Sequence, residues 1–182
     1  KKNNSYVLID EAYYGFHNYT ALHLLKKFSN LIITRTFSKA YGIAGCRVGL
    51  LIANKALSRR LYKFRPMYEI SSLSVLIVKQ IIKKEQIFKN YIGDTAKGKK
   101  ILINNLNKLG FKYFNSYSNF IVINFKSESL KNKMFKYLSK KKILSKDVPN
   151  IPAFKNCLRF TLGPVKYMKI IVDVLKEFEK KN

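Results

Sequence analysis

Acidic residues are scarce in this chain of 182 residues: 10 aspartates and glutamates stand against 36 lysines and arginines, for a net charge of +26. Such an excess normally points to nucleic acid or an anionic surface as a partner. Here the lysines are spread along the chain among many Asn, Ile, Phe and Tyr residues, a mixture typical of A/T-rich genomes. The densest basic run, Lys140-Lys141-Lys142, fits a solvated helix end. A basic nucleic-acid-binding module is therefore kept only as an alternative.

Cysteine is also rare, and long apolar runs are missing. The two cysteines, Cys46 and Cys157, are far apart and form no metal-binding pattern, so we expect no metal site. We expect no signal peptide, and no apolar run is long enough to span a membrane, which makes the cytoplasm the default compartment. What the chain does have is 47% hydrophobic residues, enough to bury a core at this length.

The most informative stretch is a polar loop between two apolar segments, Leu31–Ile33 and Val48–Ala53. A strand, a polar loop and a second strand are a common way for α/β proteins to present reactive groups. The amine of Lys39 could form a Schiff base with an aldehyde cofactor such as pyridoxal phosphate. Other residues of the loop could bind the cofactor phosphate: Thr36, Ser38 and Arg47. Taken alone, the loop is better explained as a surface turn with solvated charges.

A second motif precedes this loop. Val7–Asp10 is predicted to be a buried strand with a carboxylate at its end. Pyridoxal phosphate needs an acid that keeps its ring nitrogen protonated, and Asp10 is a candidate. Tyr13 could reach the phenolic oxygen of the ring. The alternative for Asp10 is a helix N-cap, because Asp is a favoured capping residue.

Together these segments resemble the fold-type I aminotransferases, most closely the histidinol-phosphate aminotransferase branch. The resemblance covers nearly the whole chain and is carried by three segments: Val7–Tyr13, Asn30–Gly49 and Leu158–Gly163. It implies a role for each candidate residue: Lys39 as the Schiff-base lysine, Asp10 as the partner of the pyridine nitrogen, Tyr13 as a contact of the ring oxygen, Thr36, Ser38 and Arg47 as phosphate ligands, and Arg159 as the group that binds the substrate α-carboxylate. Without the resemblance, Arg159 could simply face solvent.

The resemblance also implies an α/β fold in two parts. Residues 1–90 would be the C-terminal part of the three-layer αβα domain that binds pyridoxal phosphate, and residues 91–182 a small α+β domain. Family members are about twice this long, so we interpret the chain as a C-terminal half and expect no activity from it alone. The implied enzyme is a homodimeric aminotransferase acting on an amino acid or amino-phosphate and a 2-oxo acid. A decarboxylase of the same fold is the near alternative.

One further segment bears on the substrate. Where the family often has Gly-Ile-Leu-Val-Arg, this chain has Lys142-Ile-Leu-Ser-Lys146, without the arginine that an anionic substrate tail would favour. The identity of the amino donor therefore stays open. The remaining pattern predicts helices over 21–28, 57–64, 73–84, 90–109 and 129–141 and from Pro164 onward, and further strands over 111–115, 119–125, 143–144 and 157–162.

Overall fold

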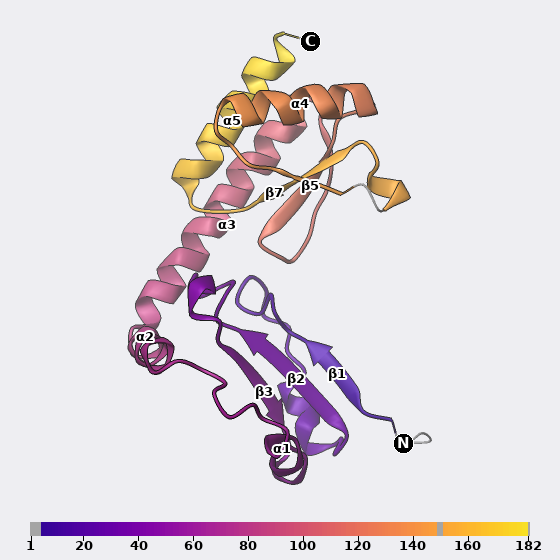
Figure 1. The fold of residues 1–182 in the computed structure, drawn as a ribbon. Coiled ribbons are helices and arrows are strands. Elements are labelled where there is room, and N and C mark those ends of the chain that lie inside the picture. Colours follow the sequence, from indigo (N-terminus) through magenta and orange to yellow (C-terminus); the bar gives the residue numbers. More distant parts are fainter. Residues whose placement is uncertain (1–4, 149–150, 182) are drawn as a thin grey trace. The chain divides into compact units, whose positions relative to one another are not determined.

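The structure is a computed structural model that describes residues 5–148 and 151–181. The chain divides into two compact units, Lys1–Asn90 and Tyr91–Asn182. Each unit has a sheet of its own (Figure 1). The two units are described separately below.

A three-stranded sheet forms the centre of the first unit, in the order β1-β2-β3 (Figure 1). Its strands are β1 (Val7–Asp10), β2 (Leu31–Thr36) and β3 (Gly49–Ala53). β1 runs parallel to β2, whereas β3 runs antiparallel to it. The first three residues of β2, the central strand, are buried. The carboxyl ends of β1 and β2 therefore lie at the same edge of the sheet, as parallel strands require.

The helical segments of this unit are η1 (Leu22–Lys26), η2 (Ala44–Cys46), α1 (Lys55–Tyr62) and α2 (Ser72–Lys83). α1 begins after Asn54, whose side chain accepts a hydrogen bond from Leu57 N–H at 2.9 Å. α2 begins after Ser71, whose hydroxyl accepts one from Ser74 N–H at 3.1 Å. Both are N-caps, which satisfy backbone donors that the first turn of a helix leaves free. Of the two serines expected to cap α2, Ser71 takes that place.

The second unit contains a four-stranded antiparallel sheet in the order β4-β5-β7-β6. Its elements are α3 (Glu85–Lys108, from Tyr91 on), β4 (Lys112–Phe114), β5 (Phe120–Asn124), α4 (Glu128–Lys140), β6 (Lys146–Asp147), η3 (Pro152–Phe154), β7 (Cys157–Thr161) and α5 (Val165–Glu179). Apolar side chains of the helices and of the two central strands meet in one core. The fully buried members include Leu102, Leu106, Ile121, Ile123, Met134, Leu138, Leu158 and Leu175.

Several expectations from the sequence pattern differ from the structure. Val7–Asp10 forms the expected strand, but it is not buried: Val7 and Leu8 are 49% and 60% exposed. The segment 21–28 contains only a 3-10 helix of five residues, η1, and the helix expected from Asn90 begins at Glu85. The strand expected at 143–144 is instead β6, at Lys146–Asp147. The reason is that Lys142 has a positive φ of 59° and Ile143 N–H bonds to Leu138 O at 2.9 Å, so both residues end α4.

An ion pair between α4 and β6 helps to place this strand. Lys131 of α4 is buried, and its Nζ lies 2.9 Å from Asp147 Oδ2. Burying an ammonium without a partner would be costly, so the pair favours this position for β6. Among the described residues, no helix is long and apolar enough to cross a membrane.

Candidate cofactor-binding site

The end of β1 places the side chain of Asp10 beside β2. Asp10 lies opposite Thr34 in the parallel register, and its Oδ1 accepts hydrogen bonds from Thr34 Oγ1 at 3.2 Å and from Ala12 N–H at 3.0 Å. No helix begins at Asp10 in the described part of the chain, so the bond to Ala12 is a turn rather than a helix cap. Because side chains alternate along a strand, Thr36 shares this face of the sheet with Asp10.

Lys39 lies in the loop after β2, between two buried neighbours. Phe37 and Ala40 are both nearly fully buried, and Phe37 N–H donates to Val48 O at 3.2 Å. These contacts fix the backbone on both sides of the lysine. The Lys39 Nζ then lies 5.8 Å from the ring centroid of Tyr13. The structure thus brings together two of the predicted site residues that are 26 positions apart in the sequence.

A glycine allows the loops after β1 and β2 to approach each other. Gly15 has a positive φ of 103°, a conformation that side chains other than glycine rarely adopt. A Cβ at this position would lie 2.8 Å from the Cβ of Ala40 and 3.0 Å from Phe88 Cζ. Any larger residue would therefore push the segment that carries Tyr13 away from the loop that carries Lys39. The sequence analysis did not assign this role to Gly15.

Two of the three predicted phosphate ligands lie together. Thr36 Oγ1 accepts a hydrogen bond from Ser38 N–H at 3.0 Å, at the start of the Lys39 loop. Arg47 is different: it has a left-handed backbone with φ 53°, and its Nη1 donates to Ala44 O at 3.2 Å. Within the described residues, no hydrogen bond joins its guanidinium to Thr36 or Ser38. The exposed side chain of Arg47 is bonded within its own loop.

Arg159 lies in the second unit, on the central strand β7. It pairs with Val122 on β5 and with Lys146 on β6. Its guanidinium carbon lies 4.9 Å from the ring centroid of Phe120, close enough for a cation–π interaction. Its Nε is buried and has no hydrogen-bond partner among the described residues. A buried N–H without an acceptor is rare in folded proteins, so this group is suited to an acceptor supplied by a ligand.

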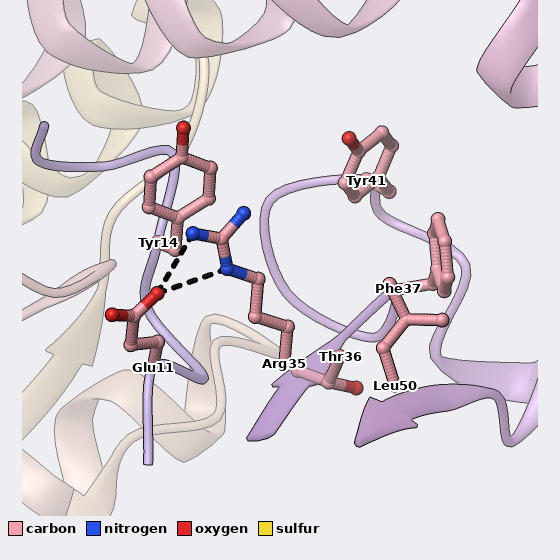
Figure 2. Close-up of a pocket in the computed structure, with 7 residues that line it drawn as sticks. All are labelled: Glu11, Tyr14, Arg35, Thr36, Phe37, Tyr41 and Leu50. Carbon is pink, nitrogen blue, oxygen red and sulfur yellow. Dashed lines mark hydrogen bonds and ion pairs between the residues drawn. The ribbon is translucent and has the colours of Figure 1, made fainter. Parts of the chain in front are cut away.

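The sequence analysis missed a polar network on the opposite face of the first sheet. Glu11 is only 6% exposed, and its Oε2 lies 2.9 Å from Arg35 Nε and 2.8 Å from Arg35 Nη2 (Figure 2). Oε1 accepts from Ala21 N–H at 2.6 Å and from Thr20 Oγ1 at 3.0 Å. The Arg35 guanidinium also lies 3.5 Å from the ring centroid of Tyr14. This network ties the segment after β1 to β2.

These contacts determine the charge state of Glu11. Burial by itself would raise the pKa of Glu11, but the hydrogen bonds from Ala21, Arg35 and Thr20, with the nearby guanidinium charge, together lower it below its usual value. Glu11 is therefore ionised at neutral pH. Burial also raises the pKa of Tyr41, so this side chain stays neutral. The Tyr41 ring stacks on Phe88, with the two ring centroids 4.4 Å apart. One face of the first sheet therefore carries the buried Glu11–Arg35 ion pair. The other face carries the polar side chains of Asp10, Thr34 and Thr36.

A small hollow lies over the Glu11–Arg35 pair. Figure 2 shows its lining residues: Glu11, Tyr14, Arg35, Thr36, Phe37, Tyr41 and Leu50. Its volume is about 60 Å³, room for a few water molecules and far less than the roughly 300–1,000 Å³ of typical ligand pockets. A more open hollow of about 360 Å³ borders Asp10. The hollow of Figure 2 is thus too small to be the ligand pocket, and its lining residues help to hold the loops of the candidate site in place.

Comparisons with known proteins agree with the family resemblance of the sequence. Residues 1–175 match the model of the family "Aminotransferase class I and II". The chain is 33% identical over 178 residues to a histidinol-phosphate aminotransferase of Thermoanaerobacter, covering 97% of this chain and 50% of that protein. It is 35% identical over 188 residues to the corresponding protein of Lactococcus lactis, covering 100% of this chain and 51% of the relative.

A solved structure shows the same fold. It is the histidinol-phosphate aminotransferase of Sinorhizobium meliloti in complex with pyridoxal-5'-phosphate, with a TM-score of 0.82 and 23% identity. The match covers 97% of this chain and 49% of that one. The expectation of an α/β fold that forms part of a pyridoxal-phosphate-dependent transferase is thereby confirmed. The chain spans about half the length of the curated relatives that it matches.

Proposed function

This chain belongs to the class I and II aminotransferase family, and we propose that it is the C-terminal half of a pyridoxal-phosphate-dependent aminotransferase similar to the histidinol-phosphate aminotransferases. Residues 1–90 would contribute to the cofactor-binding large domain, and residues 91–182 would form the small domain. The enzyme would transfer an amino group between an amino acid or amino-phosphate and a 2-oxo acid. The close match to named aminotransferases supports this function over the decarboxylase alternative.

The position of Lys39 carries the proposal. Its amine lies beside Tyr13, on the loop that follows β2, while Asp10 ends the neighbouring parallel strand. These groups fit pyridoxal phosphate, which when bound supplies an electron sink for the substrate α-carbon. Lys39 would hold the cofactor covalently and move a proton at the substrate α-carbon. Asp10 would accept the ring N–H, and Tyr13 would contact the ring oxygen.

The cofactor phosphate would bind at the start of the Lys39 loop. Thr36 and Ser38 are already adjacent there. Arg47 would join them only if its guanidinium leaves Ala44 O, a movement that its exposure allows. In the second unit, the unpartnered Nε of Arg159 is suited to the α-carboxylate of the substrate, because a guanidinium can donate two parallel hydrogen bonds to a carboxylate.

Covalent labelling of this chain tests the proposal without needing turnover. The chain would be incubated with pyridoxal phosphate and reduced with borohydride, and the modified lysines would be located by peptide mass mapping. We expect label at Lys39 to exceed label at the exposed Lys63 of the same unit by at least tenfold. Asp10→Asn should reduce labelling of Lys39 and leave that of Lys63 unchanged.

A different labelling pattern would contradict the proposal. Label scattered over many lysines would mean that this half forms no cofactor site by itself, and would contradict the assignment of Lys39 here. In the complete enzyme, Lys39→Ala should abolish turnover, with Lys63→Ala as the matched control.

The homodimer and the cytoplasmic location expected from the family resemblance stay predictions. The nucleic-acid alternative predicts an affinity for DNA that falls steeply as the salt concentration rises. An affinity for single- and double-stranded DNA that changes little with salt would argue against it.

A further inference from the structure

One face of α4 carries a row of exposed lysines: Lys133, Lys136 and Lys140. Their spacing of three and four residues places them on the same side of the helix, over about 10 Å of its length at about 1.5 Å per residue. Within the described residues, no ion pair joins any of the three to a carboxylate. Like charges at this spacing repel one another, so this face of α4 favours a ligand that brings several negative charges.

The lysine row borders a hollow between α4 and α5, which we call the α4–α5 hollow. Its volume is about 260 Å³, and the described residues that line it are these: Lys133, Lys136, Tyr137, Lys140, Phe178 and Lys181. None of the six is acidic. Four lysines and two aromatic rings thus share one hollow, which combines positive charge with an aromatic surface.

The ring of Tyr137 in this hollow is held in one orientation. Its hydroxyl donates to Glu177 Oε2 at 2.7 Å, and its ring centroid lies 5.9 Å from that of Phe178. The Lys141 Nζ lies 2.8 Å from the same carboxylate oxygen, so the charge of Glu177 is compensated beside the hollow. The Lys181 Nζ lies 5.5 Å from the Tyr137 ring centroid. A fixed aromatic ring next to lysines without acidic partners is therefore in place before any ligand binds.

We propose that the α4–α5 hollow binds single-stranded nucleic acid, as a second activity beside the proposed aminotransferase function. Phosphate groups would contact the lysine row, and a base would stack on Tyr137, a combination that proteins binding single strands commonly use. Lys181 is exposed, so its ammonium can move from the ring to a phosphate. A duplex fits less well, because its bases are stacked on one another and leave no face for Tyr137. An acidic peptide could pair with the lysines but has no base to stack on the ring.

Fluorescence anisotropy with this chain and a fluorescein-labelled oligothymidylate of about eight nucleotides tests the role of the lysine row. We expect the double variant Lys136→Glu, Lys140→Glu to raise the Kd about tenfold or more, and to make the Kd less dependent on salt. The matched control is Lys79→Glu, Lys83→Glu on α2. These two lysines are also exposed, four residues apart and at the end of their helix, and the change in net charge is the same. The control should raise the Kd less than about threefold, because it changes only the overall charge.

An abasic oligonucleotide of the same length tests the role of the aromatic ring without a protein variant. It has the same phosphates but no bases, so it should bind about fivefold more weakly or worse. Tyr137→Leu should abolish this difference between the two oligonucleotides, whereas Tyr137→Phe, which keeps the ring, should retain it.

Several results would overturn the proposal. They are absence of binding, equal weakening by the two lysine pairs, equal affinity for the two oligonucleotides, tighter binding of a duplex of the same length, and displacement by polyglutamate as effective as by unlabelled oligothymidylate. The proposal does not rest on the role of Lys39. Selective labelling of Lys39 by pyridoxal phosphate is measured separately, so failure of the α4–α5 hollow and failure of the proposed function are distinguishable.

Discussion

Removing the carboxylate of Glu11 should destabilise the first unit more than any other single loss of charge there. Glu11 is buried and joined to Arg35 through two guanidinium nitrogens, as well as to Ala21 N–H and the Thr20 hydroxyl. Breaking a buried ion pair by deleting one partner typically costs 3–5 kcal/mol, because the other charge is left without compensation. The Arg35 side chain is 17% exposed, so water can reach part of it, and we expect the lower end, about 3 kcal/mol, for Glu11→Ala.

Urea unfolding followed by far-UV circular dichroism measures this loss, since the chain has no tryptophan to report by fluorescence. With a slope of about 1.5 kcal/mol/M, a change of about 3 kcal/mol lowers the midpoint by about 2 M. Hydrogen exchange at the buried amide of Ile33 would assign the change to the first unit. Glu11→Gln should cost less than Glu11→Ala, because its side-chain oxygen can still accept from Ala21 N–H.

A matched control separates buried from exposed charge. Glu69 is also paired with an arginine, Arg65, at 2.7 Å, but both side chains are at least 40% exposed. Exposed pairs contribute about 0.2–1 kcal/mol, so Glu69→Ala should lower the midpoint by well under 1 M. Equal urea midpoints for the Glu11 and Glu69 variants would refute the reasoning, because burial would then not change how much an ion pair contributes to the free energy of unfolding.

Two further predictions concern acid stability and helix packing. The pKa of Glu11 is lower in the folded state than its unfolded value of about 4.5, so its contribution to stability is fully present above that value and is lost as the pH falls through the folded pKa. The unfolding midpoints of wild type and Glu11→Gln should therefore converge as the pH falls below about 4.5. On α3, Gly98→Ala should lower the melting temperature of the second unit, because a Cβ would overlap Gly163 O, whereas Gly93→Ala on the same helix meets nothing within 4 Å and should stabilise by about 0.5–1 kcal/mol. Equal effects of the two alanines in calorimetry would contradict the packing argument.

The sequence points to candidate site residues through local patterns, and their roles in cofactor binding stay predictions. An apolar run that ends in Asp10, and a lysine between hydroxyl groups, are local patterns that can be read without knowing the fold. Expectations were less accurate where a backbone group bonds outside its own element. η1 replaces the helix expected at 21–28 while Ala21 N–H is held by the Glu11 carboxylate, a contact over 10 positions. Likewise, Leu144 belongs to an apolar pair that suggested a strand, but its neighbour Ile143 is used to end α4.

The residues that hold the binding loops in place could not be predicted from the sequence for a related reason. Glu11 and Arg35 are separated by 24 positions, and in a chain with 36 basic residues no single pairing stands out from the sequence. Gly15 likewise gives no local signal, because its role depends on the methyl group of Ala40 from a different loop. Only the fold shows which of the many charged and small residues meet.

The alternation of side chains along β1 and β2 explains why neighbouring acids should behave differently. Asp10 and Glu11 are adjacent in sequence, but Asp10 lies on the face of Thr34, whereas Glu11 lies with Arg35 on the other. Asp10 is exposed and bonded only through one oxygen in the described structure, so its replacement should affect cofactor labelling more than unfolding. Glu11 is buried and fully bonded, so its replacement should affect unfolding first. One step along the chain thus separates a residue suited to bind a ligand from a residue that holds the binding loops in place.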